Sequence, residues 1–268
     1  MVLSLGILDI GKQYFYGQAK TQIFDSRRDL GIAAAQRASE CIHNAILDRG
    51  RARVMIATGN SQLDVSTALV EQTSIDWGRV DLFHMDEYVG LDADHPASFR
   101  RWIKERIVDR VHPASVAYIE GNAPDLKTEL DRYAGLLQQQ PMDVAFIGFG
   151  ENGHIAFNDP GMANFFDPLA MKCVDLDPEC RAQQVNEGHF KTVDEVPRQA
   201  LSVSCSGLLR ARSWICCVPE GRKAKAVHRA LNGPIGTACP ASVVRLHLDA
   251  RVYLDRDSAA LLGPPVND

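Results

Sequence analysis

The chain has 268 residues, of which 46% are hydrophobic and 24% are charged, and its formal net charge is −5. This length suits one large α/β domain or two small ones, and the composition is that of a globular protein rather than a disordered or fibrous one. Affinity for a nucleic-acid backbone needs an excess of Lys and Arg, so the negative charge argues against nucleic acid and favours small-molecule partners.

The N-terminus and the cysteines predict a cytoplasmic protein. Residues 1–17 lack the basic start and unbroken apolar core of a signal peptide, and no stretch of the chain approaches the ~18 apolar residues of a membrane span. The seven cysteines contain no C-x-x-C pair, which is typical of reduced packing residues. We therefore expect no membrane partner. Homo-oligomerisation stays open.

Apolar runs alternate with segments of helical spacing along most of the chain. Residues 1–20 show no clear pattern and are interpreted as an N-terminal extension of unknown role, followed by a single domain over residues 21–268. A first helix is expected between Asp25 or Ser26, as its cap, and Gly50. Strands are expected near residues 21–24, 54–57, 80–84, 116–119, 144–147, 171–174, 200–203, 214–218 and 252–254.

Helices are expected between several of these strands, which predicts an α/β fold with a mainly parallel sheet covered on both faces. The helical segments are 63–70, 99–108, 126–137 and one that ends at residue 231. The polar segment 177–191 has few apolar residues and is predicted to be a lid or a binding loop.

Small polar residues follow the strand at 54–57 and precede a helix. This layout is typical of a phosphate-binding loop, because backbone N–H groups and hydroxyls at a helix N-terminus favour an anion. A plain turn between a strand and a helix uses similar residues, and both interpretations stay open at this point. The residues are Thr58, Gly59, Asn60 and Ser61, and Lys223, in the first turn of a later helix, is a second candidate anion ligand.

Titratable residues follow two other strands. Asp86 and Glu87 come after the strand at 80–84, where a carboxylate suits a general base. In an arbitrary pair of this kind the more common arrangement is that the aspartate caps a turn and the glutamate is solvated. After the strand at 144–147, His154 lies in a glycine-punctuated loop with Asp159 five residues later. A carboxylate-oriented imidazole is a possible general acid or base.

Other chemistries are disfavoured by missing motifs. The eight histidines form no H-E-x-x-H sequence and no zinc spacing with cysteines, so no metal is expected. Residues 148–153 match G-x-G-x-x-G, but no ribose-binding acid follows within a βαβ unit, which argues against a dinucleotide. The nucleophile elbow G-x-S-x-G is also absent. We therefore expect no cofactor.

Two motifs resemble those of the glucosamine-6-phosphate deaminase (isomerase) family, which is related to the 6-phosphogluconolactonases. They are M-D-E-Y-V-G-L at 85–91, followed by H-P-x-S at 95–98, and G-x-G-x-N-G-H-I-A-F-N-D-P at 148–160. The resemblance covers the chain from about residue 21 to the last strand. It implies a Rossmann-like three-layer α/β/α sandwich that converts glucosamine 6-phosphate and water into fructose 6-phosphate and ammonia without a cofactor.

The resemblance also implies roles for individual residues. Asp86 matches the base that moves a proton from C2 to C1 of the open-chain sugar, and His154 matches the residue that assists ring opening. Asp159 stands where the family usually has the glutamate that orients this histidine. The loop 58–61 and Lys223 match the family's phosphate ligands, and Arg181 is the candidate for an additional arginine on the phosphate.

Asn152 departs from the family, in which some members carry an aspartate; it can orient an imidazole but cannot share its proton. Three alternatives stay open. They are a galactosamine-6-phosphate isomerase, a 6-phosphogluconolactonase, whose D-E-R and G-H-T-A-S-L-F patterns are not found in this chain, and a non-catalytic sugar-phosphate-sensing domain.

Overall fold

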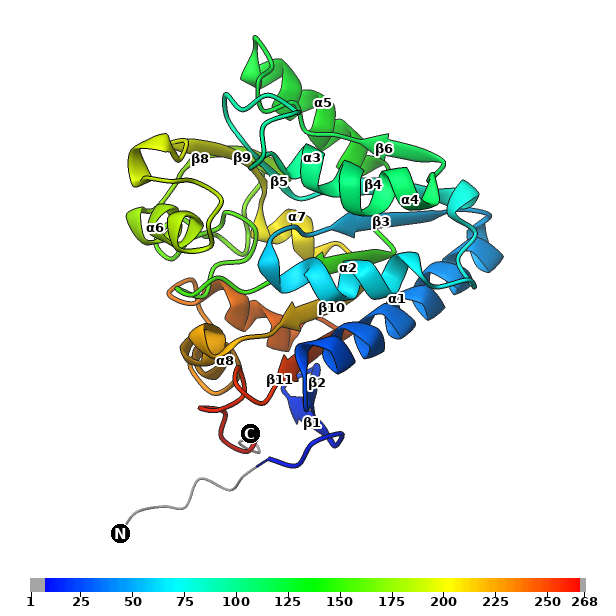
Figure 1. The fold of residues 1–268 in the computed structure, drawn as a ribbon, viewed down its shortest axis with the longest axis vertical. Coiled ribbons are helices and arrows are strands. Elements are labelled where there is room, and N and C mark those ends of the chain that lie inside the picture. The colour runs from blue at the N-terminus through cyan, green and yellow to red at the C-terminus, as the bar shows by residue number, and fades with distance from the viewer. Residues whose placement is uncertain (1–7, 266–268) are drawn as a thin grey trace.

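The computed structural model describes residues 8–265, and residues 1–7 and 266–268 lie outside this description. Within the described residues, an eight-stranded sheet runs in the order β1-β2-β11-β10-β7-β3-β4-β6. Only β1 pairs antiparallel in this sheet; the other neighbours pair in parallel. The predicted α/β fold with a mainly parallel sheet is confirmed (Figure 1).

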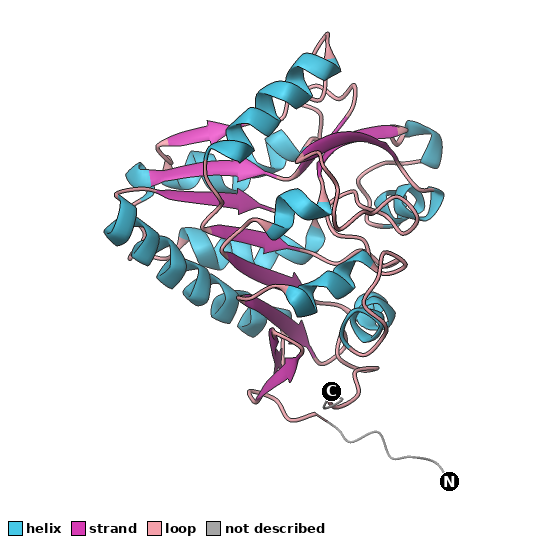
Figure 2. Ribbon diagram, turned by 180° about the vertical axis from the view of Figure 1, so that it is seen from behind, coloured by secondary structure: helices cyan, strands magenta, loops and turns pink. Residues whose placement is uncertain are grey.

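Helices cover both faces of the sheet and make it the middle of three layers. One face carries α1 (Arg27–Arg49), α2 (Leu63–Val70) and α4 (Asp109–Val111), while α5 (Leu126–Gln139) and α7 (Cys205–Leu209) lie on the other (Figures 1 and 2). None of the helices in the described range is long and apolar enough to cross a membrane. The strands are β1 (Gln13–Tyr16), β2 (Ala19–Phe24), β3 (Ala52–Ile56), β4 (Val80–His84), β6 (Ser115–Ala117), β7 (Val144–Ile147), β10 (Ser213–Val218) and β11 (Ala250–Asp255).

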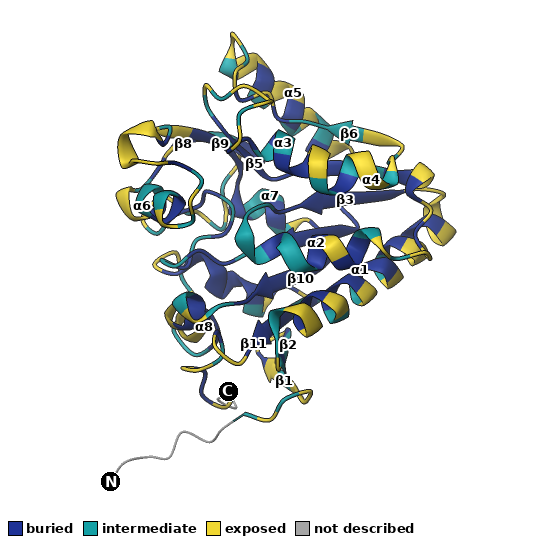
Figure 3. Cartoon of the chain, viewed as in Figure 1, coloured by how far each residue is buried: buried dark blue, intermediate teal, exposed yellow. Residues whose placement is uncertain are grey.

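The central strands are buried from end to end. Every residue of β3, β7 and β10 is buried, and in Figure 3 these strands are dark blue beneath partly exposed helices. Because helices cover both faces, these strands need no alternation of polar and apolar residues. This explains why the sequence marks them as continuous apolar runs.

Helix α1 begins and ends where its sequence predicts. The side chain of Ser26 accepts a hydrogen bond from the N–H of Asp29 (3.1 Å), which satisfies one of the free donors of the first turn. At the other end, Gly50 has a φ of 78° and its N–H donates to the carbonyl of Ile46 (2.8 Å). Only glycine adopts this left-handed conformation without steric cost, so the helix stops there.

The predicted boundary after residue 20 is wrong, because it falls inside β2. Residues 13–16 and 19–22 form an antiparallel hairpin on the edge of the sheet. Tyr16 is buried and its hydroxyl donates to the carbonyl of Gly263 (2.5 Å), which ties the hairpin to the C-terminal segment. Residues 13–20 therefore belong to the domain; the part of the predicted extension before residue 8 lies outside the described residues.

A second sheet covers the ends of the central strands. β5 (Asp86–Tyr88), β9 (Gln199–Val203) and β8 (Met171–Asp175) pair antiparallel, in this order, instead of joining the parallel sheet. The polar segment 177–191 forms helix α6 (Pro178–Asn186), not an open loop. The segment has few apolar residues, but these suffice to anchor it, because Cys180 and Phe190 pack into a small separate core with Tyr88 and Phe157.

Tyr133 of α5 supports the end of β4. Its hydroxyl is buried, donates to the carbonyl of His84 (2.7 Å) and accepts from the N–H of His84 (2.9 Å). The pairing of β4 with β6 ends one residue earlier, at Phe83, so the sheet does not supply these partners on that side.

We expect Tyr133→Phe to lower the free energy of unfolding by about 1–3 kcal/mol, because the buried N–H and carbonyl of His84 lose a partner. Urea denaturation measures this change. The control is Tyr118→Phe, since the Tyr118 hydroxyl makes no hydrogen bond with a described residue; equal losses in the two variants would contradict the supporting role of Tyr133.

Candidate active site

Four neighbouring strands carry the predicted site residues to one edge of the sheet. In the order β10-β7-β3-β4, they lead into Lys223, His154, the loop 58–61 and Asp86. Between β7 and β3 the strand order reverses, which is where open α/β sheets bind ligands. One pocket at this edge is lined by Thr58, Gly59, Asn60, Ser61, Asp86, Gly150, His154, Phe157, Gln183, Glu187, Arg222 and Lys223, among others.

Asp86 presents a carboxylate that is nearly desolvated. It is 7% exposed, lines the pocket and accepts no hydrogen bond at its side chain from a described residue. Burial, and then the charge of the adjacent Glu87, raise the pKa of Asp86 to about 8. A carboxylate with so high a pKa binds a proton far more strongly than an ordinary one, which suits a base that works near neutral pH.

Glu87 is fully buried instead of solvated, so it is not the surface carboxylate that such a pair usually contains. It accepts hydrogen bonds from the N–H groups of Tyr88 (2.9 Å), Phe99 (3.2 Å) and Arg100 (3.0 Å), and from the hydroxyl of Ser98 (2.8 Å). Burial raises its pKa and these hydrogen bonds oppose that shift. The carboxylate thereby caps helix α3 (Phe99–Ile103) and fixes the strand that carries Asp86.

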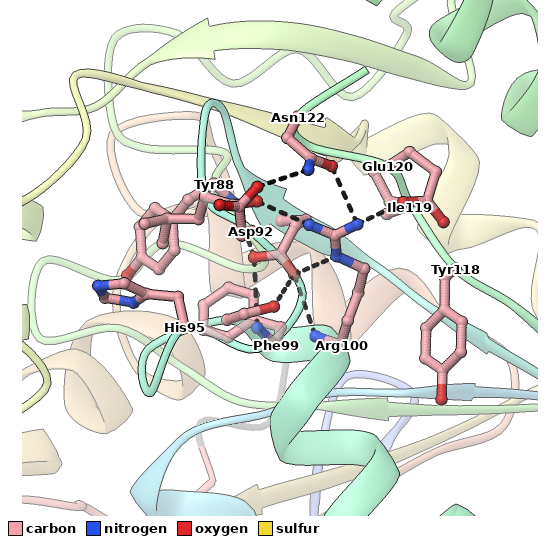
Figure 4. Close-up of polar contacts among 12 residues, drawn as sticks. Tyr88, Asp92, His95, Phe99, Arg100, Tyr118, Ile119, Glu120 and Asn122 are labelled. Carbon is pink, nitrogen blue, oxygen red and sulfur yellow. Dashed lines mark hydrogen bonds and ion pairs between the residues drawn. The ribbon is translucent and has the colours of Figure 1, made fainter.

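Arg100 connects Glu87 to the loop that contains Glu120 and Asn122. Figure 4 shows it reaching Glu120 and Asn122; its guanidinium also lies 3.4 Å from Glu87 and donates to the carbonyl of Leu91 (2.7 Å). The side chain of Arg100 is only 5% exposed, so these contacts form in a poorly solvated environment. Loss of Arg100 would leave the buried Glu87 without its nearby cation, whereas Glu120 and Asn122 are exposed to solvent.

His154 packs directly against Gly150, where any other residue would displace the imidazole ring. A Cβ atom on Gly150 would lie 2.2 Å from the imidazole ring, well inside van der Waals contact. The glycine-rich start of the motif at 148–160 is therefore explained by the close approach of the ring, not by dinucleotide binding.

Asp159 and Asn152 hold the other side of His154. His154 Nδ1 lies 3.0 Å from Asp159 Oδ1, which also accepts a hydrogen bond from Asn152 Nδ2 (2.9 Å), while Asn152 Oδ1 accepts from the His154 N–H (2.9 Å). Burial raises the pKa of Asp159, but the contacts with His154 and Asn152 bring it below its ordinary value. The predicted proximity of His154 and Asp159 is confirmed, and Asn152 links the two.

The opposite part of the pocket is suited to an anion. Gly59 has a φ of 90° and turns the chain into a short 3-10 segment, Asn60–Gln62, that leads into α2. Lys223 is 3% exposed, and its ammonium forms no hydrogen bond or ion pair with any described residue. Burial lowers its pKa, and the nearby Glu187 opposes this. A buried cation without a direct partner attracts an anionic ligand.

Arg181 does not reach this pocket, so the structure does not bring it to the other phosphate candidates. Its guanidinium donates to the carbonyls of Val193 and Val196 and ties α6 to the segment that follows it. Arg222 lines the pocket instead, 2.7 Å from Glu187 and 3.1 Å from Glu151. The sequence signal for Arg222 is its position directly before Lys223.

The lid prediction for 177–191 is consistent with the pocket, which α6 and the next residue line. Gln183, Gln184 and Glu187 contribute to the wall. Their helical spacing is the signal that would have found them, because residues three and four apart share one helix face.

We expect Asp86→Asn to stabilise the protein above neutral pH. Between the ordinary pKa of a carboxyl, near 4, and the value of about 8 in the fold, the unfolded chain has lost the proton that the folded chain retains, so ionisation lowers stability as pH rises. Asparagine has no such proton. In urea denaturation the gain should grow from pH 5 to pH 8, and Asp94→Asn, at an exposed aspartate, is the control measured beside it. A gain in Asp86→Asn that does not change with pH would contradict the raised pKa.

Comparisons with known proteins agree with this site. A family model described as glucosamine-6-phosphate isomerases/6-phosphogluconolactonase matches residues 25–253. A glucosamine-6-phosphate deaminase of Listeria innocua is 32% identical over 231 residues, which are 86% of this chain and 96% of that protein. The solved structure of a monomeric glucosamine-6-phosphate deaminase is similar with a TM-score of 0.82 at 27% identity, covering 90% of this chain and 99% of that one. A Trypanosoma brucei 6-phosphogluconolactonase, at 16% identity, shares the fold with a TM-score of 0.75, covering 91% and 98%. The chain therefore belongs to the glucosamine-6-phosphate isomerase/6-phosphogluconolactonase family, as its motifs predicted.

Proposed function

We propose that the protein is a glucosamine-6-phosphate deaminase, which converts glucosamine 6-phosphate and water into fructose 6-phosphate and ammonia in amino-sugar catabolism. The observation that carries this proposal is that acid-base groups and anion-binding groups line the same pocket. A desolvated carboxylate and an oriented imidazole, Asp86 and His154, share it with the loop 58–61 and Lys223. The relatives of about 30% identity that carry this activity in their names support the same substrate.

Asp86 acts as the base of the isomerisation. Its carboxylate takes the proton from C2 of the open-chain amino aldose and returns it to C1. The C1 oxygen gains a proton and the amino group loses one in the same isomerisation, which leaves a hydroxyl at C1 and an imine at C2. Water then adds to C2, ammonia leaves, and the ketone of fructose 6-phosphate remains. A base with a pKa near 8 removes a carbon-bound proton more readily than an ordinary carboxylate does.

His154 opens the sugar ring before this step. Its imidazole takes the proton of the C1 hydroxyl and delivers a proton to the ring oxygen, so no net proton is consumed. Asp159 and Asn152 are positioning residues, because they contact the histidine and not the pocket. Asp159 also stabilises the imidazolium that forms between the two proton transfers.

The substrate phosphate binds at the loop 58–61 and Lys223. Backbone N–H groups at the start of the 3-10 segment and the hydroxyls of Thr58 and Ser61 donate to it, and Lys223 supplies the charge. Arg222 takes the place that the sequence suggested for Arg181. Asp86 performs the carbon-bound proton transfer and His154 the ring-opening transfers, so these steps use no metal.

Galactosamine 6-phosphate is the second candidate substrate, because the same groups would act on the C4 epimer. The 6-phosphogluconolactonases share the fold at identities below 25%, and the motif patterns of this chain follow the deaminases. A cytoplasmic location and assembly into a homo-oligomer are proposed from the sequence alone. The similar solved deaminase is described as monomeric.

The test is the release of ammonia and fructose 6-phosphate from glucosamine 6-phosphate, run beside galactosamine 6-phosphate and 6-phosphogluconolactone. We expect turnover of glucosamine 6-phosphate, and a fall of about 10²–10⁴-fold in kcat for Asp86→Asn, which is the typical contribution of a general base. Substrate affinity should be nearly unchanged in this variant. No turnover of either amino sugar, or full activity without Asp86, would refute the assignment.

Removal of the Lys223 charge should weaken phosphate binding. We expect Lys223→Met to raise KM about 10–100-fold, because a charge-assisted hydrogen bond contributes about 1.5–3 kcal/mol. Arg181→Met is the matched control and should change KM less than about twofold, since Arg181 bonds only to backbone carbonyls outside the pocket. Steady-state kinetics distinguish the two; a larger effect for Arg181 would restore it as the phosphate ligand.

A further inference from the structure

Behind the imidazole, three potential metal ligands of different chemistry come together. His154 Nδ1, a carboxylate oxygen of Asp159 and Cys180 Sγ all lie within 4.8 Å of one another. The first two residues follow β7, and the third lies in the first turn of α6. Asp159 and Cys180 are each 1% exposed, so the cluster is buried beside the pocket, which only His154 of the three lines.

These atoms have lone pairs that the protein does not use. Asp159 Oδ2 is buried and has no hydrogen-bond partner among the described residues. His154 Nδ1 is also buried; it lies 3.0 Å from Asp159 Oδ1 but outside hydrogen-bonding geometry. Cys180 is a free thiol, and none of the hydrogen bonds of the described residues involves its sulfur. Buried polar atoms without partners are rare in folded proteins and point to a missing ligand.

The surrounding charges favour a cation. Burial first, and then the carboxylates of Asp159, Asp177, Asp86 and Glu187, raise the pKa of the Cys180 thiol. The same negative potential that disfavours a thiolate alone favours a thiolate bound to a divalent cation. A nitrogen, an oxygen and a sulfur ligand form a set that zinc and other thiophilic divalent ions prefer over magnesium or calcium.

We propose that His154, Asp159 and Cys180 form an inhibitory site for a thiophilic divalent cation such as Zn²⁺ or Cd²⁺. In tetrahedral coordination with bonds of about 2.0–2.3 Å, ligand atoms lie about 3.3–3.7 Å apart, so the cluster needs to contract by about 1 Å. Water from the pocket fills the fourth position. Binding releases the thiol proton to solvent.

Inhibition follows from the proton on the imidazole. A metal on Nδ1 uses the lone pair of this nitrogen, so the single proton of the neutral imidazole resides on Nε2. A protonated Nε2 cannot accept the proton of the C1 hydroxyl, so ring opening stops. The inhibitory effect rests on the proposed function, whereas metal binding itself does not.

Binding is tested without reference to activity. Cadmium added to the purified full chain should produce the ultraviolet charge-transfer band of a Cd–thiolate bond at about one equivalent, because one cysteine is involved. Cys180→Ala and Cys180→Ser should lose this band, with circular dichroism to check folding. Cys173→Ala, which removes a half-buried cysteine elsewhere, should keep it. A band that survives in both Cys180 variants would overturn the site.

Measurements of enzyme activity test the inhibitory role of the site. Zinc should inhibit the deamination of glucosamine 6-phosphate by the wild-type protein and by Cys173→Ala, and EDTA should restore full rate. In Cys180→Ala the half-inhibiting zinc concentration should rise at least about tenfold, since one of three protein ligands is gone. Equal zinc sensitivity in the Cys180 variants would overturn the inhibitory role. If no variant deaminates, the cadmium band still decides whether the site exists, and the failure lies with the proposed function.

Discussion

Parallel pairing of four strands in the order β10-β7-β3-β4 is the constraint on which the site depends. Parallel strands point their carboxyl ends to one edge, so the loops that follow them lie side by side even though the chain visits them in another order. The register joins Ile56 to His84 and Val54 to Val144, which sets the relative heights of the loop 58–61 and Asp86 at that edge. Without this order the catalytic and anion-binding groups would be far apart.

The second, antiparallel sheet shields the ends of the parallel strands from solvent. Uncovered, the ends of parallel strands are open to solvent, and a carboxylate there would keep its ordinary pKa. β5 places Asp86 under this cover, and the small core around Tyr88 and Phe157 excludes water from one wall of the pocket. The fully hydrogen-bonded Glu87 fixes the strand that holds Asp86 in this buried position, and its charge adds to the rise in the pKa of Asp86.

The same burial links catalysis with sensitivity to metals. An imidazole that exchanges protons has a usable lone pair, and a neighbouring carboxylate stabilises positive charge on it. When α6 brings a thiol to this pair, the three groups also satisfy the preferences of a thiophilic cation. Cys180 is there for packing, since it belongs to the small core under the lid, and its position close to the dyad follows from that role.

The sequence by itself determined much of this protein. Continuous apolar runs predicted the buried strands, Ser26 and Gly50 predicted the ends of α1, and the motifs at 85–91 and 148–160 identified the family and the residues Asp86, His154 and Asp159. These are local signals, since a cap, a strand period or a motif is written in neighbouring residues. They required no knowledge of where the chain goes next.

Only the tertiary structure decided which separate segments meet. Local pattern could not show that Arg181 bonds to Val193 and Val196 while Arg222 faces the pocket, because both are arginines near helix starts. It treated 177–191 as a loop, since the few apolar residues that anchor α6 pack against partners distant in sequence. Glu87 was expected in solvent and is buried, because its partners lie eleven to thirteen residues away across a turn. Pocket membership, burial and pKa depend on contacts between distant segments, and these exist only in the folded chain.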